Sequence, residues 1–307
     1  MGAKKKTVYV PTAAELDGML WAQGYSRWIS APIDPTTVRP HELDYLRGIH
    51  NKPLLTALAE WLSGKLSRGV RLRSMWQDKH VYVSPLDGSG LDLPIRELAD
   101  LAVIVNNITS TGIERSMWIL QAKVAAKPLS LFTGDSSKKE IELFENTDCF
   151  FLLDGKGSHS GRAHDARDFS GPKHWAFMTF HKNHRVPQKK GDRFPVMMRW
   201  PGSSSPLSPS VDSFCASLLD VCRGNLGASV DAPPEDDEWS RLYRSLLVDA
   251  RVRRMTGYAK THSNVKGSVR QLAASSLPVF KGSLRSVMMY SDKYPDWAYR
   301  GHSRWPE

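Results

Sequence analysis

The chain has 307 residues, of which 41% are hydrophobic and 24% charged, as is ordinary for a globular protein with a buried core. Lysines and arginines exceed aspartates and glutamates by 42 to 32, and the formal charge of +10 favours a polyanion such as nucleic acid as partner. The three cysteines have no zinc-finger spacing, and their small, odd number argues against a disulfide framework. The chain has no apolar run of ~18 to 20 residues, which argues against a membrane span. We therefore expect a cytoplasmic protein with no membrane partner.

The first third of the chain predicts an entry segment followed by helices. Residues 1–40 mix short apolar pieces with prolines and are expected to wrap the domain. From residue 41 to about 67, apolar residues recur at helical spacing. Pro53 either divides this stretch into two helices or lies in the first turn of the second. Residues 80–87 predict a short strand that Pro85 and a turn close.

The middle of the chain predicts strands. Asp100–Val105 and Ser116–Ala125 are apolar, and the polar stretch 106–115 between them predicts an antiparallel hairpin with a long loop. Further segments predict a helix at 137–146 and strands at 148–154, 174–181 and 194–200.

Two helices are predicted after the loop at 201–210. The first begins with Ser210 as its cap and ends at Gly224, and the second covers 233–255, with acids at its start and arginines at its end. We therefore predict an α/β fold with a mixed central sheet flanked by helices. The α/β core spans 41–205, and a helical, basic C-terminal region, 206–307, packs on it.

The C-terminal region carries most of the positive charge. From Arg241 onward, 13 lysines and arginines stand against 4 aspartates and glutamates. Five basic residues of this region are candidates for phosphate contacts, with a solvated helix end as the alternative: Arg251, Arg253, Arg254, Lys260 and Lys266.

The predicted hairpin carries candidate chemistry. A hairpin symmetric about Thr111 places residue 100 opposite 122, and a shift of one residue places Asp100 opposite Gln121 or Lys123. Gln121 and Lys123 share a face because strand side chains alternate, so such a shift gathers all three, whereas another register separates Asp100 from them. A carboxylate with a neighbouring oxygen ligand can hold Mg²⁺ or Mn²⁺, and a lysine beside them can orient water and stabilise phosphate charge.

This pattern resembles the catalytic hairpin of the PD-(D/E)XK nuclease superfamily, the restriction-endonuclease-like fold, in its Gln-x-Lys form. The resemblance covers residues 42–123 and implies that Asp100 and Gln121 bind the metal and that Lys123 is catalytic. It also implies a helix glutamate, for which Glu60 is the first candidate and Glu42 the second, and Glu97 is a further possible ligand. Two departures are Ala99 in place of the usual proline and uncharged Gln121 in place of an acid.

Structural interpretations remain open beside the catalytic one. Asp100 fits a turn at a strand entry, and Lys123 fits a charged residue that protects a sheet edge. Histidines between residues 159 and 184 have no metal-site spacing, and the chain contains no phosphate-binding GxxxxGK[ST] loop.

We expect a metal-dependent endonuclease that hydrolyses DNA, acting as the effector of a prokaryotic anti-phage system and gated by a regulatory protein partner or by homo-oligomerisation. The alternative is a catalytically inactive DNA-binding subunit that retains the nuclease fold. A third possibility is that the substrate is RNA.

Overall fold

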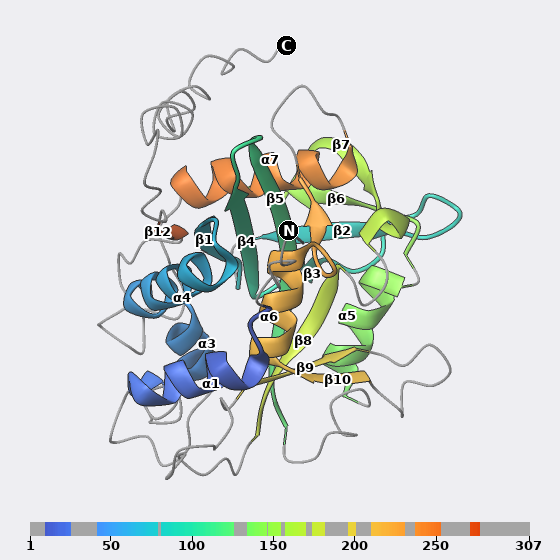
Figure 1. Ribbon diagram of the computed structural model, residues 1–307. Coiled ribbons are helices and arrows are strands. Elements are labelled where there is room, and N and C mark those ends of the chain that lie inside the picture. The colour runs from blue at the N-terminus through green and yellow to red at the C-terminus, as the bar shows by residue number, and fades with distance from the viewer. Residues whose placement is uncertain are drawn as a thin grey trace, which may run out of the picture.

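The computed structural model (Figure 1) describes most of the chain up to residue 252 and one strand beyond it. The described residues are 10–25, 42–78, 81–125, 134–145, 147–154, 157–169, 174–181, 196–200, 210–230, 237–252 and 271–276.

A mixed sheet occupies the centre of the molecule, in the order β10-β9-β8-β5-β4-β1-β12, with β11 paired to β5. Its strands are β1 (Gly69–Trp76), β4 (Leu101–Ile108), β5 (Ile113–Ala125), β8 (Trp175–His181), β9 (Val196–Trp200), β10 (Ser210–Ser213), β11 (Ala228–Ser229) and β12 (Gln271–Ser276). Neighbouring strands are antiparallel except β5 and β8, which are parallel. A parallel pair needs a crossover connection, and helix α5 (Asp135–Glu145) lies between these two strands in the sequence. The predicted α/β class with a mixed central sheet is confirmed.

A second, smaller sheet lies against the first. It is antiparallel and has the order β3-β2-β6-β7, formed by β3 (Arg96–Glu97), β2 (Tyr82–Leu86), β6 (Cys149–Leu153) and β7 (His159–Asp165). Strand β7 lies in the first part of the histidine-rich stretch, at residues for which the sequence predicts no strand. This sheet matters for the site because β3 carries Glu97.

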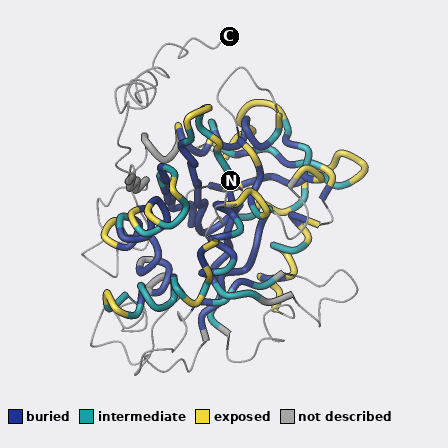
Figure 2. Tube along the Cα trace, viewed as in Figure 1, coloured by how far each residue is buried: buried dark blue, intermediate teal, exposed yellow. Residues whose placement is uncertain are grey.

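The central sheet separates two apolar cores, because alternate side chains of each strand point to opposite faces. One core joins Val103 of β4 and Leu120 of β5 to four helices, which are α1 (Ala13–Ala22), α3 (Glu42–Ile49), α4 (Lys52–Leu66) and α6 (Phe214–Arg223). The other joins Ile104 and Ile119 to the small sheet, to α5 and to α7 (Glu238–Val252). Figure 2 shows the strands between these layers as the most continuously buried part of the chain.

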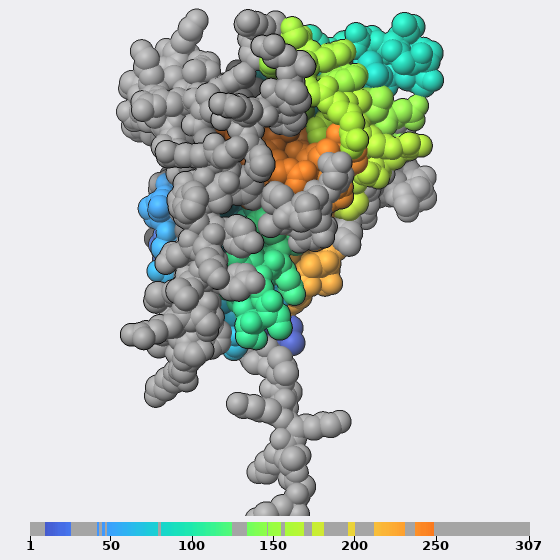
Figure 3. All heavy atoms as spheres, turned by 90° about the horizontal axis from the view of Figure 1, so that it is seen from above, coloured from blue at the N-terminus to red at the C-terminus, as the bar shows by residue number. Residues whose placement is uncertain are grey.

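Helix α7 closes one end of the second core. Figure 3 looks onto this end and shows α7 between the tip of the β4–β5 hairpin and the β6–β7 strands. Leu242 and Leu246 of α7 are buried there, and Trp239 donates its indole N–H to the Asp168 carbonyl at 2.7 Å. Asp168 belongs to a short 3₁₀ helix, Ala166–Phe169, that follows β7.

The β4–β5 hairpin differs from the prediction in its length. The connection is a tight turn closed by a hydrogen bond from Thr109 N to Gly112 O (2.9 Å), and the strands extend through most of the polar stretch 106–115. Two polar side chains there have partners in the fold, since Arg115 Nε donates to Asn106 Oδ1 across the strands at 3.0 Å and Asn107 Nδ2 donates to Cys222 O of α6 at 2.9 Å. The prediction of a long loop, which was based on the polarity of residues 106–115, was therefore wrong.

The helices begin and end for local reasons. The predicted pair at 41–67 is confirmed as α3 and α4, with Pro53 in the first turn of α4 and Asn51 accepting from Leu54 N at 3.2 Å as its cap. Helix α6 ends at Gly224, as predicted, with φ of 80°. Its cap is Ser213, which accepts from Ala216 N at 3.1 Å, and Ser210 was predicted wrongly because residues 210–213 pair with β9 instead.

Segments outside the predicted core also contribute to it. Within the entry segment, α1 buries Leu16 and Leu20 in the first core. Strands β10, β11 and β12 pair with the central sheet, which therefore takes strands from both sides of residue 205. Among the described helices, none is long and apolar enough to cross a membrane.

Most of the basic C-terminal region cannot be placed, because residues 253–270 and 277–307 lie outside the described part of the chain. Within this region, which was predicted to be helical as a whole, residues 271–276 form a strand. All five predicted phosphate-contacting residues lie outside the residues whose side chains the structure describes.

Candidate metal centre

Asp100 occupies the junction of three strands of the central sheet. It directly precedes β4, and its N–H donates to Leu120 O of β5 at 3.1 Å. Its carbonyl accepts from Gln77 N at 2.9 Å and from Asp78 N at 3.2 Å, both just beyond the end of β1. The backbone of Asp100 is therefore fixed from both sides, which fixes the starting point of its side chain.

The end of the hairpin brings Asp100 beside Gln121 and Lys123. The paired ladder ends with Leu101 opposite Leu120, and the N–H of Asp100, directly before Leu101, donates to the same Leu120 O. The strands therefore have the register that would set Asp100 opposite Gln121, while Asp100 itself lies just outside the ladder. Gln121 and Lys123 share a face of β5 because strand side chains alternate, and the charge of Asp100 acts on Lys123. The Asp100 carboxylate also accepts from Ala122 N at 2.6 Å, and Gln121 Nε2 donates to Leu98 O at 3.2 Å.

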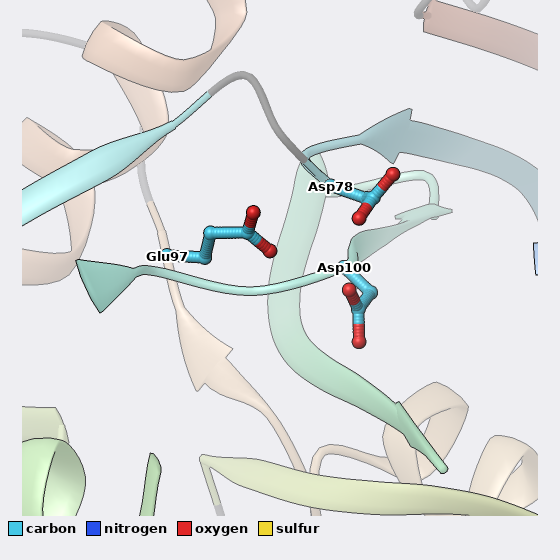
Figure 4. A group of neighbouring side chains, drawn as sticks. All are labelled: Asp78, Glu97 and Asp100. Atoms are coloured by element: carbon cyan, nitrogen blue, oxygen red, sulfur yellow. The ribbon is translucent and has the colours of Figure 1, made fainter. Parts of the chain in front are cut away.

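Three carboxylates converge at this junction. Asp78, Glu97 and Asp100 each offer an oxygen, and these oxygens lie within 4.8 Å of one another. Figure 4 shows the Glu97 carboxylate directed toward the two aspartates. Both aspartates are buried, and Glu97 is half-buried. Oxygens on opposite sides of Mg²⁺ lie about 4.2 Å apart because each bond is ~2.1 Å, so the donor set fits a small hard cation after a slight closure.

Glu97 is held by the small sheet. It pairs with Tyr82 across β3 and β2, and its carboxylate accepts a hydrogen bond from the Tyr82 hydroxyl. Burial and the negative charge of Glu97 raise the pKa of Tyr82, so this tyrosine remains a donor at neutral pH. The three carboxylates therefore come from two sheets.

Lys123 is paired with a carboxylate of helix α5. Its Nζ lies 2.7 Å from Glu140 Oε1 and 3.3 Å from Ser136 Oγ, and both members of the ion pair are about 85% buried. Burial by itself would lower the pKa of Lys123, but the negative charges of Glu140, Glu42 and Asp100 outweigh it and raise that pKa. Lys123 is therefore a charged ammonium at neutral pH.

Glu42, the first residue of α3, also reaches the hairpin. Its carboxylate accepts from the backbone N–H of Val124. Burial, helped by the charges of Glu140 and Asp78 and opposed by Lys123, raises the pKa of Glu42 to about 7. Glu42 is thus poised between its charged and neutral forms near physiological pH.

The pKa of Asp100 lies well above its ordinary value. Burial is the largest cause and the charge of Glu42 the next, while Lys123 and the Ala122 N–H oppose them. A bound cation would act in the same sense as Lys123 and favour the ionised carboxylate.

The structure brings most of the predicted site residues together but not all of them. Asp100, Gln121, Lys123 and Glu97 lie together, and the second-choice helix glutamate, Glu42, joins them. Glu60, the first choice, is not among the convergent carboxylates of the described residues; it is exposed on α4, and its charge acts on Tyr25.

Asp78 escaped prediction from the sequence. Its only signal in the sequence is the polar pair Gln77–Asp78 directly after the stretch that ends at Trp76, and this signal does not indicate which residues lie beside it.

The histidine-rich stretch forms other contacts. His164 Nδ1 lies 3.1 Å from Glu238 Oε2, and His159 Nε2 lies 3.4 Å from Asp92 Oδ1. In the part of the chain that the structure describes, no histidine belongs to a group of three convergent metal-ligand atoms. Comparisons of the chain with protein-family models, with curated proteins and with solved structures found no match.

Proposed function

We propose that this protein is a metal-dependent endonuclease that hydrolyses phosphodiester bonds in DNA. One observation carries the proposal: Asp100, directly before β4, lies beside the Gln121–Lys123 end of β5, and its carboxylate oxygen lies within 4.8 Å of those of Asp78 and Glu97. Acid, amide and lysine in this order resemble the catalytic hairpin of the PD-(D/E)XK superfamily.

Mg²⁺ would be held by Asp78, Glu97 and Asp100, and Gln121, whose amide nitrogen donates to Leu98 O, would offer its amide oxygen as a further ligand. When bound there, Mg²⁺ supplies Lewis acidity and a more acidic bound water. Three carboxylates give the site its charge even though Gln121 contributes none. This compensates for the departure at residue 121, since Asp78 supplies the negative charge that the amide lacks.

Lys123 would act as a donor to the substrate phosphate. Because its pKa is raised, it is an ammonium over the physiological range and has no free lone pair for a base. An ammonium fixed beside the scissile phosphate stabilises the negative charge that builds up on its oxygens in the transition state. The raised pKa thereby favours charge stabilisation over proton abstraction as the role of this lysine.

Affinity for DNA would come from the excess of positive charge. The formal charge of +10 attracts the phosphate backbone, and the resulting affinity falls steeply with salt because counterions are released on binding. This property alone does not separate DNA from RNA, which is why both substrates enter the test.

The test is nicking of supercoiled plasmid with Mg²⁺ or Mn²⁺, in parallel with labelled RNA of the same length range. Wild-type protein should nick the plasmid, EDTA should stop the nicking, and Lys123→Ala should lower its rate about 10²- to 10³-fold. Lys138→Ala is the matched control, because Lys138 is a lysine of α5 that is 64% exposed. Cleavage by Lys123→Ala at the wild-type rate would refute the proposal.

A second candidate function is a DNA-binding subunit without cleavage. The observation that favours it is Gln121, an uncharged residue whose amide nitrogen is already engaged by the Leu98 carbonyl. Retained DNA binding, with no nicking under either metal, would establish this candidate over the nuclease.

The proposal extends to a role as effector in prokaryotic anti-phage defence, controlled by a partner protein or by self-association. Its support is the resemblance to the nuclease superfamily. Phage plating on cells that express wild-type protein or Lys123→Ala tests it, and equal plating on the two would exclude it.

A further inference from the structure

Helix α5 contacts both parts of the candidate metal centre. Its Glu140 accepts from Lys123 of the central sheet at 2.7 Å. Its Glu142 accepts from Arg96 of the small sheet at 2.6 Å. Arg96 directly precedes Glu97, so a single helix is bonded to the lysine and to the neighbour of a carboxylate that belongs to the other sheet.

The helix is itself well anchored. Leu143 and Phe144 are fully buried, and the Phe144 ring stacks on Trp175 with centroids 4.9 Å apart. Trp175 Nε1 donates to Glu145 Oε1 at 2.9 Å, and Thr147 Oγ1 donates to the Glu142 carbonyl at 2.9 Å. Contacts along the whole C-terminal half of α5 therefore fix Glu140 relative to the sheet.

Glu140 bonds to Lys123 through one carboxylate oxygen, while its other oxygen is buried without a hydrogen bond. Its Oε1 accepts from Lys123 and, at 3.0 Å, from Ser136 Oγ one turn earlier on α5. Its Oε2 is buried and has no hydrogen-bond partner among the described residues. A buried carboxylate oxygen without a partner destabilises the fold, so stability alone does not explain the residue.

We propose that Glu140 is a positioning residue, which holds the Lys123 ammonium beside Asp78, Glu97 and Asp100, so that α5 sets the place of the lysine relative to the metal. This inference rests on the proposed nuclease function. A lysine side chain has four rotatable carbon–carbon bonds, and transition-state stabilisation needs its charge at a defined point. The contacts with Glu140 and Ser136 fix the position of the Lys123 ammonium, and neither of these residues belongs to the metal site.

The test uses Glu140→Gln in the full chain, which keeps the shape and removes the charge. Cleavage should lose about 10- to 100-fold in kcat, the usual effect of removing a residue that orients a catalytic group, while KM stays unchanged. Glu140→Asp keeps the charge on a shorter side chain and should lose less. Glu114→Gln is the matched control, because Glu114 is an exposed glutamate at the opposite end of β5.

A second readout does not need cleavage. In ¹⁵N-lysine-labelled protein, the Lys123 ammonium should give a signal protected from solvent exchange, assigned by its loss in Lys123→Arg. Glu140→Gln should broaden or shift that signal, and Glu114→Gln should not.

The outcomes separate the inference from the function beneath it. Unchanged or increased kcat in Glu140→Gln, or an unchanged ammonium signal, overturns the positioning role. A wild-type protein that cleaves nothing, but whose ammonium signal changes in Glu140→Gln, refutes the nuclease while the Glu140–Lys123 contact stands.

Discussion

Replacing Glu42 with glutamine should make the metal-free protein more stable at high pH. Burial raises the pKa of Glu42 from 4.5 to about 7. A raised folded-state pKa means that the folded protein holds a proton which the unfolded chain releases. The associated stability is present below about pH 4.5 and is lost as the pH rises through 7. Each pKa unit corresponds to about 1.4 kcal/mol, so ionised Glu42 costs the folded state about 3 kcal/mol.

Glutamine has the shape of the protonated carboxyl and cannot ionise. The free energies of unfolding of wild type and Glu42→Gln should therefore be similar near pH 4.5, diverge as the pH rises, and differ by about 3 kcal/mol above pH 7.5. Taking the difference between the two proteins cancels the other titrating groups.

The assay is urea unfolding in EDTA, followed by fluorescence between pH 5 and 8.5, with free energies from linear extrapolation. Glu114→Gln, at an exposed glutamate, serves as the control and should follow wild type at every pH. Parallel curves for wild type and Glu42→Gln would show that Glu42 is not buried among like charges, and would refute the reasoning.

Three further changes have expected outcomes. Lys123→Ala should lower the cleavage rate about 10²- to 10³-fold, measured on plasmid under single-turnover conditions, because it removes a charge aimed at the transition state. Asp78→Asn should weaken Mg²⁺ binding by at least about tenfold in calorimetry, whereas Glu60→Gln should leave it unchanged; equal affinities would remove Asp78 from the site. Gly227→Ala should destabilise the fold by about 1 to 3 kcal/mol in thermal unfolding, because Gly227 has φ of +77° and an added Cβ would lie 3.1 Å from Met117 O; an unchanged melting temperature would contradict this strain.

The proximity of the hairpin residues could be predicted from the sequence because it is local. Asp100, Gln121 and Lys123 lie on two consecutive strands, so one turn decides whether they meet, and alternation then gives the shared face. The turn itself was misjudged, since polar residues between apolar runs resemble a loop. Asn106 and Arg115 are instead a cross-strand pair, and their hydrogen bond can be recognised only once the register is known.

The choice between Glu60 and Glu42 shows what a helical pattern can decide. Glu60 lies two residues from Leu58 and two from Leu62, both buried, and two residues correspond to about 200° around a helix. The pattern of α4 therefore places Glu60 on the solvent side, and that information was present in the sequence. Glu42 begins a different helix, and its approach to Val124 depends on how α3 packs against β5.

Asp78 depends on the tertiary structure more strongly still. Strand β1 reads GVRLRSMW, in which Val70 and Leu72 alternate with two arginines, a pattern that indicates a strand but not the strand beside it. Its place beside β4 comes from pairing such as Trp76 with Leu101, across residues that form the small sheet. Without that pairing, nothing in the sequence brings Asp78 to Asp100.

The charge balance of the site connects its fold to its chemistry. Five carboxylates and one ammonium of the described residues lie around the hairpin end: Glu42, Asp78, Glu97, Asp100, Glu140 and Lys123. One ion pair neutralises only a fifth of the negative charge, and buried like charges are costly. In the metal-free chain the cost is lowered by protons, as the raised pKa values of Glu42, Asp100 and Glu140 indicate. A divalent cation must displace those protons, so its affinity should increase with pH over the range in which Glu42 ionises. The fold can thus form without the metal, while the same carboxylates that strain it at high pH are what would bind the metal tightly.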